Sequence, residues 1–223
     1  MDKFKYVFFD LDGTLADTDP DIRRAWKAAL VDLNLECPDF DAKFVAGPPI
    51  DEMVKILFPA QFTQELADAV REGFARHYDG DGFPQTFEYP GVMDEVRRLK
   101  AEGRVVAIVT NKRYVGATAM ARHFGWDKVF DGIYAGDMTE PKVRKPELLR
   151  RVLAHYGAAP ADCILVGDTA NDFEAAAANG VRSLAVAWGY GKPEELARAD
   201  AICRALPLPI GIHGRPLATY ENA

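Results

Sequence analysis

"KYVFFDLDGTLADTD" (Lys5–Asp19) is the stretch that decides how the rest of the chain is interpreted. Four apolar residues, Tyr6–Phe9, predict a short buried strand, and two acids, Asp10 and Asp12, follow it directly. Burying a carboxylate without a partner costs several kcal/mol, and neither Lys nor Arg stands beside these two acids. A positive partner must therefore come from elsewhere in the chain or from a bound cation.

Composition limits the class of protein. A chain of 223 residues can bury one sizeable core, either as one domain or as one domain with a smaller insert. The net charge of −7 argues against a broad basic surface, and no apolar run approaches a membrane span. We therefore expect no nucleic-acid and no membrane partner. Three cysteines without C-x-x-C spacing, and a start unlike a signal peptide, favour a cytoplasmic location.

Apolar runs alternate with helical patterns over most of the chain. The runs cover residues 5–9, 104–109, 163–166 and 183–188. Continuous apolar runs are typical of strands buried on both faces of a parallel sheet. The helical patterns cover residues 90–103, 145–157 and 171–180, and each ends at a glycine. This order predicts an α/β fold with a doubly wound parallel sheet.

One region breaks this alternation. Between residues 16 and 84 only helical patterns occur, over residues 20–33, 49–58 and 64–78. Such a segment is too long for an ordinary connection between elements. It predicts a small helical cap at residues 16–84, inserted into an α/β core of residues 1–15 and 85–223. The C-terminal residues 206–223, interrupted by Pro and Gly, predict a tail that packs on the core.

Polar residues gather where the predicted strands end. Asp10 follows the first strand, Thr110 and Asn111 follow the second, and Asp168 follows the third. Lys145 opens the helix before that third strand. Ligands of open α/β sheets bind beyond the carboxyl ends of the strands, so these groups should converge. Carboxylates there are typical of a Mg²⁺ site, and an ammonium with backbone amides suits a phosphate.

Four motifs occur in a fixed order: "DLDGTL" (10–15), "VTN" (109–111), "RKPELL" (144–149) and "GDTANDFEAAAANG" (167–180). Together they resemble the motifs of the haloacid dehalogenase-like hydrolase superfamily, over residues 4–14 and 90–200. The place of the helical insert resembles the subgroup with a helical cap. Within it, "YPGV", "GPPI" and "AWGYG" are most similar to the phosphoglycolate phosphatase group.

Each motif also has a purely structural interpretation. Thr110 and Asn111 could cap a helix, Asp168 could be an N-cap, and Asp172 could be an acid in a first helical turn. The D-x-D-G-T start could open a calcium loop. Such a loop needs glycine at its sixth position, however, and the sixth residue here is Leu15. The order of all four motifs favours the family.

The resemblance implies a role for each catalytic residue. Asp10 is the nucleophile that forms an aspartyl-phosphate, and Asp12 is the general acid and then the general base. Thr110, with the Asn111 amide and Lys145, binds the transferring oxygens. Lys145 is selected over the nearby lysine at position 142 because only Lys145 precedes a proline, as the motif requires.

The resemblance also implies a metal site and a specificity loop. Mg²⁺ would be held by Asp10, the Asp12 carbonyl, Asp168 and Asp172, the last directly or through water. The cap would recognise the leaving group through a loop that contains the substrate-binding candidates Gly47, Pro48 and Pro49.

The expected function is that of a Mg²⁺-dependent phosphatase acting on a small phosphomonoester, with 2-phosphoglycolate as the first expectation. Asp12 speaks against the dehalogenases and the phosphonate-cleaving members, which lack this second aspartate. A β-phosphoglucomutase-like mutase, a pyrophosphatase or nucleotidase, and a non-catalytic binding protein remain alternatives. Both a monomer and a homodimer fit the sequence.

Overall fold

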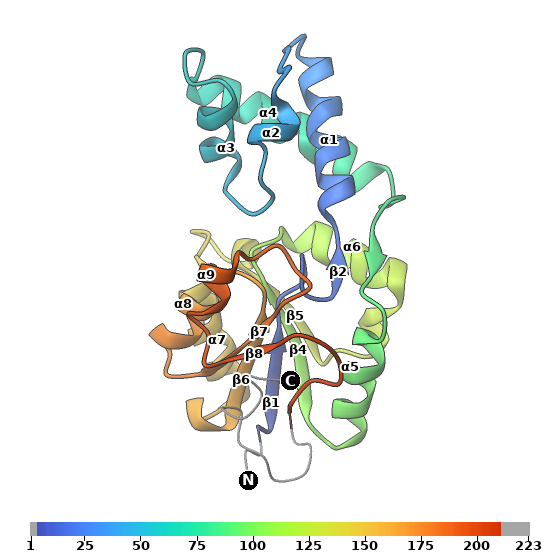
Figure 1. Ribbon diagram of the computed structural model, residues 1–223, viewed down its shortest axis with the longest axis vertical. Coiled ribbons are helices and arrows are strands. Elements are labelled where there is room, and N and C mark those ends of the chain that lie inside the picture. The colour runs from blue at the N-terminus through green and yellow to red at the C-terminus, as the bar shows by residue number, and fades with distance from the viewer. Residues whose placement is uncertain (1–3, 211–223) are drawn as a thin grey trace. The chain divides into compact units, whose positions relative to one another are not determined.

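Six parallel strands form the central sheet of the protein. The computed structural model describes residues 4–210, and Figure 1 shows the sheet with helices on both of its sides. The strand order is β5-β4-β1-β6-β7-β8. The strands are β1 (Tyr6–Phe9), β4 (Val105–Thr110), β5 (Gly132–Ala135), β6 (Cys163–Gly167), β7 (Arg182–Val186) and β8 (Ala201–Cys203). The prediction of a doubly wound parallel α/β sheet is confirmed.

The four predicted apolar runs form the four central strands. All residues of β1 and β6 are buried, because helices cover both faces of the sheet. The two edge strands, β5 and β8, were not singled out by the sequence. They have only four and three residues, and most of β5 is partly exposed. Their apolar runs are continuous but have only three residues, 133–135 and 201–203, which is too short to predict a strand.

Helices cover the two faces of the sheet. Figure 1 shows α5 (Val92–Ala101) and α6 (Tyr114–Phe124) on one side, with α7 (Lys145–Tyr156) and α8 (Ala170–Ala178) on the other. Leu149 of α7 and Ala175 of α8 pack with Phe8 of β1 in one apolar cluster. The predicted helices at 90–103, 145–157 and 171–180 correspond to α5, α7 and α8. Helix α9 (Pro193–Leu196) and 3₁₀ turns at Trp126–Lys128, Gly136–Met138 and Pro160–Asp162 lie in the connections around the sheet.

Residues 18–86 form a second compact unit. Its helices are α1 (Asp19–Asp32), α2 (Phe40–Lys43), α3 (Ile50–Leu57) and α4 (Gln64–Gly80). Trp26 of α1 packs with Phe40 of α2, Met53 of α3 and Val70 of α4 in an apolar cluster of this unit's own. We call residues 18–86 the cap unit, and the rest of the described chain the core unit.

The boundaries differ from the predicted cap of residues 16–84. The cap unit begins at residue 18 and ends at residue 86, because a short antiparallel pair belongs to the core unit. In this pair β2 (Ala16–Asp17) lies against β3 (Phe87–Glu88). Pairing between two-residue strands so far apart in sequence leaves no local pattern that could have revealed it.

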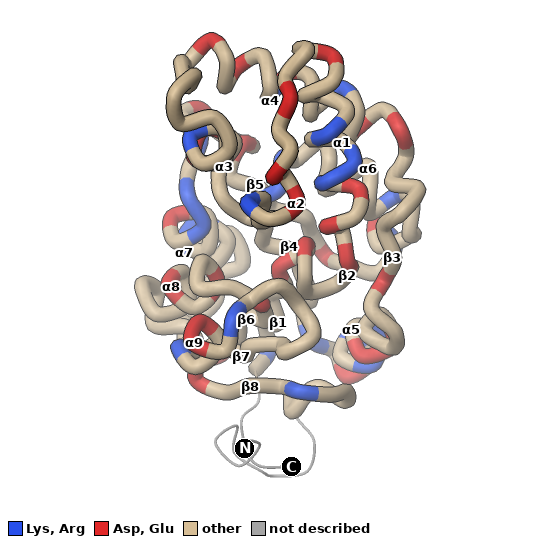
Figure 2. The backbone as a smooth tube through the Cα atoms, turned by 45° about the horizontal axis from the view of Figure 1, so that its top comes forward, with Lys and Arg blue, Asp and Glu red and all other residues tan. Residues whose placement is uncertain are grey.

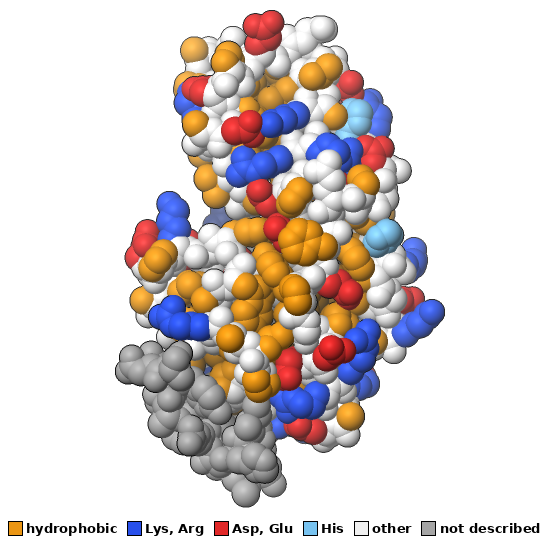
Figure 3. All heavy atoms as spheres, turned by 45° about the vertical axis from the view of Figure 1, so that its right-hand side comes forward, with side chains coloured by type: hydrophobic (Ala, Val, Ile, Leu, Met, Phe, Trp, Pro, Cys, Tyr) orange, Lys and Arg blue, Asp and Glu red, His pale blue; other side chains and the backbone are white. Residues whose placement is uncertain are grey.

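The surface of residues 4–210 mixes charged and apolar groups. Figure 2 shows Lys and Arg interspersed with Asp and Glu on both units, and Figure 3 shows hydrophobic side chains at the surface of both. No helix within this described range is long and apolar enough to cross a bilayer. All three cysteines are free thiols. Of the predicted tail, Leu208 and Ile210 are buried, and residues 211–223 lie outside the described part.

Candidate active site

Three neighbouring strands bring the predicted polar residues to one edge of the sheet. In β1, Phe9 pairs with Ile108 of β4 on one side and with Val166 of β6 on the other. The backbone N–H of Asp10 donates to the Val166 carbonyl at 2.9 Å, which extends the ladder by one residue. Asp10, Thr110 and Asp168 therefore stand at the carboxyl ends of adjacent strands, where such sheets bind ligands.

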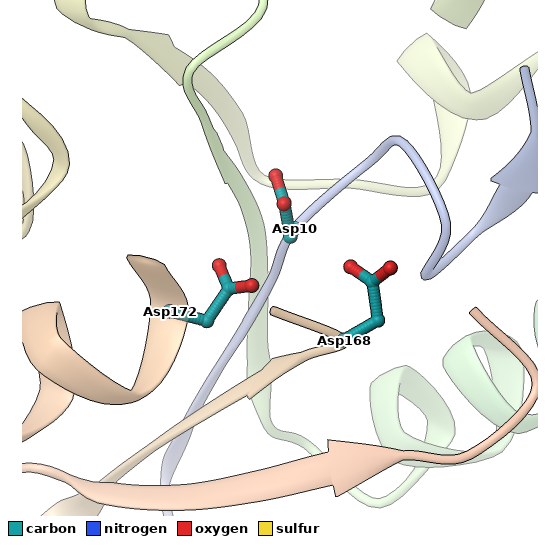
Figure 4. Close-up of side chains that lie close together, drawn as sticks. All are labelled: Asp10, Asp168 and Asp172. Atoms are coloured by element: carbon teal, nitrogen blue, oxygen red, sulfur yellow. The ribbon is translucent and has the colours of Figure 1, made fainter. Parts of the chain in front are cut away.

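Three buried carboxylates form the centre of this site. Asp10, at the end of β1, is 8% exposed, and Asp168, after β6, and Asp172, in α8, are fully buried. Oxygens of the three lie within 4.8 Å of one another. Figure 4 shows the three carboxyl groups approaching a common region from these elements. Three acids this close repel one another unless a cation is present, so the arrangement suits a metal ion.

Lys145 supplies one positive charge to this cluster. It is the first residue of α7, its side chain is 2% exposed, and its Nζ lies 2.9 Å from Asp10 Oδ1. Nζ also donates a hydrogen bond to Asp172 Oδ1. Burial lowers the pKa of Lys145, but the two carboxylates outweigh burial and hold this pKa above its usual value. Lys145 is therefore a buried ammonium beside Asp10, whereas its sequence competitor Lys142 is exposed.

One ammonium does not neutralise three acids. Burial raises the pKa of Asp10 to about 6, although Lys145 opposes the rise. Burial also raises the pKa of Asp168 to about 8, and the charges of Asp172 and Asp10 add to the rise. Asp10 Oδ1 accepts no hydrogen bond, although the Lys145 ammonium is near. A bound cation would offset the repulsion between these buried carboxylates and give Asp10 Oδ1 a further partner.

The turn after β7 holds Asp168. The Tyr190 amide donates to Asp168 Oδ2 at 2.7 Å, and the Thr14 hydroxyl donates to Oδ1 at 3.2 Å. This approach requires glycine at position 189, because a Cβ there would lie 2.3 Å from the Gly13 carbonyl oxygen. Tyr190 belongs to the stretch "AWGYG", which indicated only the family resemblance and did not predict a place for Tyr190 in the site.

Asp172 is held on both oxygens. Besides Lys145 on Oδ1, the Thr169 amide and hydroxyl each donate to Oδ2 at 3.1 Å. Thr169, and not Asp168, is the N-cap of α8, so the N-cap interpretation of Asp168 is wrong. Asp172 combines the structural and the functional interpretation, because it lies in the first turn of α8 and also belongs to the carboxylate cluster.

Asp12 lies outside the buried cluster and pairs with a different lysine, Lys112. Its side chain is 25% exposed, and Asp12 Oδ1 accepts a hydrogen bond from Lys112 Nζ at 2.8 Å. The Lys112 amide donates to the Thr110 hydroxyl at 3.1 Å, which holds the chain after β4. Lys112 was not among the residues predicted for the site. Its only signal was its position directly after the "VTN" motif.

The other predicted site residues are in different surroundings. Thr110 is buried as the last residue of β4, and Asn111 is exposed just after it. Neither caps α6, whose N-cap is Arg113. The three loop candidates lie in the cap unit between α2 and α3, where Gly47 has a φ of 118°. Their role in specificity stays a prediction. They are Gly47, Pro48 and Pro49.

Several known proteins are similar to this chain over most of its length. A family profile described as haloacid dehalogenase-like hydrolase matches residues 7–186. A phosphoglycolate phosphatase of Thiobacillus denitrificans is 32% identical over 91% of this chain and 92% of its own length. A 5'-nucleotidase of Pseudomonas aeruginosa is 30% identical over 87% of each chain.

A solved structure extends the likeness to the fold. A haloacid dehalogenase-like family hydrolase of Streptococcus pneumoniae superposes with a TM-score of 0.79 at 27% identity, covering 91% of this chain and 94% of its own. The family profile spans the strand ends that carry Asp10, Thr110 and Asp168, together with Lys145. The protein is a hydrolase, and it belongs to the haloacid dehalogenase-like hydrolase family.

Proposed function

We propose that this hydrolase is a Mg²⁺-dependent phosphatase that cleaves a small phosphomonoester through an aspartyl-phosphate on Asp10. The observation that carries the proposal is the state of Asp10. It is a buried carboxylate at the edge of the sheet where ligands bind, and its Oδ1 lies 2.9 Å from the Lys145 ammonium without further hydrogen bonds. A structural acid is held by several hydrogen-bond donors, whereas the contact given for this oxygen is the ion pair with Lys145, which would also hold a phosphoryl group beside it.

The donor set fits a hard divalent cation. Asp10 and Asp168 each offer a carboxylate oxygen to the same cluster, and the pKa of each is raised, first by burial and then by the neighbouring acids. The main-chain carbonyl of Asp12 is a further candidate ligand. Both oxygens of Asp172 already accept hydrogen bonds, which favours contact through water for this residue. When bound, Mg²⁺ would offset the repulsion between an anionic nucleophile and an anionic phosphate.

In the first half of the reaction, an Asp10 oxygen attacks phosphorus and the bond from phosphorus to the ester oxygen breaks. Asp12 donates a proton to that oxygen, so the leaving group departs as a neutral alcohol. Asp12 suits this task because it is partly exposed, two residues beyond the nucleophile, in the turn at Gly13.

In the second half, Asp12 takes a proton from water while that water attacks the phosphorus of the aspartyl-phosphate. The bond between phosphorus and the Asp10 oxygen breaks, which frees the Asp10 carboxylate and inorganic phosphate. Lys145 would bind the phosphoryl oxygens during both steps, and Thr110 and the Asn111 amide would do so from the end of β4. The burial of Lys145 beside Asp10 supports its part.

The first substrate to test is 2-phosphoglycolate. A relative at 32% identity bears the name phosphoglycolate phosphatase, and the loop Gly47–Pro49 of the cap unit remains our candidate for leaving-group recognition. A second candidate function is the hydrolysis of nucleoside 5'-monophosphates, which is supported by the relative named 5'-nucleotidase at 30% identity.

The test is phosphate release with and without Mg²⁺ from 2-phosphoglycolate, adenosine 5'-monophosphate, glucose phosphates and pyrophosphate. Asp10→Asn serves as the blank. We expect Mg²⁺-dependent turnover that the blank lacks, and the preferred compound identifies the substrate class. Conversion of one glucose phosphate into another would instead indicate a mutase. Turnover by Asp10→Asn at the wild-type rate would contradict the covalent mechanism.

A further inference from the structure

We propose that Lys112 is a specificity-determining residue that selects phosphomonoesters whose leaving group carries a second anionic group close to the ester oxygen. The inference rests on the proposed function and deepens it, because it assigns the chemical class of the leaving group to one side chain of the core unit. It starts from the contact between Lys112 and Asp12, which bridges the loop after β4 and the loop after β1.

The position of Lys112 is well defined. Its Nζ lies 2.8 Å from Asp12 Oδ1, and its side chain is only 7% exposed. Its backbone is tied to the end of β4 by the hydrogen bond from its amide to the Thr110 hydroxyl. A long lysine side chain on a free surface would lose much conformational entropy in holding one position, whereas this one is enclosed. The ammonium is therefore held at the general acid.

The two ammoniums of the site serve different acids. Lys145 lies against Asp10 and Asp172, on the side of the nucleophile. Lys112 lies against Asp12, on the side of the leaving group. In an in-line displacement the attacking and leaving oxygens are on opposite sides of phosphorus. One cation is thus beside the transferring phosphoryl group, and the other is beside the alcohol that departs.

Asp12 can protonate the leaving oxygen only at hydrogen-bond distance from it. Since Lys112 contacts Asp12 directly, the ammonium then lies one further contact away from the same oxygen. A carboxylate separated from the ester oxygen by a single carbon would reach that ammonium, and a neutral alkyl group would gain nothing from it. Charge-assisted contacts in weakly exposed surroundings are worth roughly a tenfold change in affinity or more.

A positioning role through Asp12 alone is the competing explanation. In that case Lys112 would hold the Asp12 carboxylate, and its loss would slow every substrate equally. The charge of the leaving group separates the two explanations. The neutral amide of 2-phosphoglycolate keeps the shape, the phosphate and the ester oxygen of the acid and removes only the second charge.

The experiment measures kcat/KM for 2-phosphoglycolate and for its amide with the wild-type protein, Lys112→Met and Lys112→Arg. We expect Lys112→Met to lower kcat/KM for the acid at least about tenfold more than for the amide, and Lys112→Arg to recover most of the difference. Lys142→Met is the control, because Lys142 is exposed on the loop that follows β5. It should leave the ratio between the two substrates unchanged.

A binding measurement removes the chemistry of Asp12 from the comparison. Titration calorimetry of both compounds into Asp10→Asn, with and without Lys112→Met, reports affinity without turnover. A selective loss of affinity for 2-phosphoglycolate supports the inference. Equal effects on acid and amide, or no effect on either, overturn it.

The two proposals fail separately. If the wild-type protein with Mg²⁺ hydrolyses neither ester nor any other phosphate, the proposed function fails, and the binding measurement still decides whether Lys112 takes the second anion. The protein could hydrolyse phosphomonoesters while Lys112→Met keeps the wild-type ratio of kcat/KM for 2-phosphoglycolate to kcat/KM for its amide. In that case the proposed function stands and the inference fails.

Discussion

Asp21 in the cap unit and Asp10 in the core unit are both buried acids, but they have opposite surroundings. Asp21 Oδ2 accepts hydrogen bonds from the Gln85 amide and the Thr86 hydroxyl, each at 2.8 Å. Asp21 Oδ1 accepts one from Arg24 Nε at 2.9 Å. Asp10 Oδ1, by contrast, has an ion pair with Lys145 but no further donor, and it lies beside two further buried acids.

The difference separates a structural acid from a chemical one. A buried carboxylate whose oxygens are all engaged stabilises one arrangement of the chain, here the start of α1 against residues 85–86. A buried carboxylate that shares one ammonium with other acids, and whose pKa burial raises, does not stabilise the folded chain in this way. A bound ligand would offset the energetic cost of burying this carboxylate.

Asp10→Asn should have the largest effect on activity. Removal of the nucleophile should lower kcat by about 10³-fold or more, while the midpoint of thermal unfolding changes little, because the lost charge was not stabilising the fold. Phosphate release measures kcat, and differential scanning calorimetry of the same preparation measures the midpoint of thermal unfolding. A large fall in the unfolding midpoint would show that Asp10 is a structural acid after all.

Asp21→Asn should reverse this pattern. Asparagine would place its side-chain N–H groups against groups that now donate hydrogen bonds to the carboxylate. We therefore expect a loss of about 2–4 kcal/mol in the free energy of unfolding. Urea unfolding of the metal-free protein measures this loss. With kcat assayed well below the unfolding midpoint, activity should stay within a few-fold of the wild-type value. Unchanged stability would contradict the structural role.

The free energy of unfolding should depend on pH through the buried acids of the core unit. Burial raises the pKa of Asp10 to about 6 and that of Asp168 to about 8, so the folded protein keeps protons that the unfolded chain releases above pH of about 4. The free energy of unfolding of the metal-free protein should therefore fall as the pH rises from about 5 to about 8.

Added Mg²⁺ should oppose this fall. It should raise the unfolding midpoint more at the upper end of that pH range than at the lower end, because metal binding competes with protons for the carboxylates. Thermal scans at several pH values, with Mg²⁺ or with a chelator, test both statements. Asp168→Asn should remove most of the Mg²⁺ effect, and an unchanged effect would exclude Asp168 as a ligand.

Tyr190→Phe should have the smallest effect. Its hydroxyl donates to Asp17 Oδ1 at 2.9 Å, and its amide, which the substitution keeps, holds Asp168. Loss of one neutral donor should cost about 1 kcal/mol of unfolding free energy and lower kcat a few-fold. The matched control is Tyr114→Phe, since Tyr114 is 41% exposed. Equal results for both variants would show that the Asp17 contact has no influence on the site.

Local patterns were sufficient for the central part of the fold and for the main acids of the site. The continuous apolar runs predicted β1, β4, β6 and β7, because strands buried on both faces leave no polar positions. Asp10, Asp168 and Lys145 stand at strand and helix ends that those runs define, so their convergence followed from sheet topology alone.

The apolar runs, the long helical stretch and the motifs therefore predicted the parallel α/β core, the helical insert and the acids at the strand ends. The partners of the acidic side chains became known only from the packing of the folded chain. Lys112 meets Asp12 across 100 positions of the chain, and Gln85 meets Asp21 across 64. The physical reason is that hydrophobic periodicity reports whether a residue is buried, whereas a hydrogen-bond partner depends on how distant elements pack against one another.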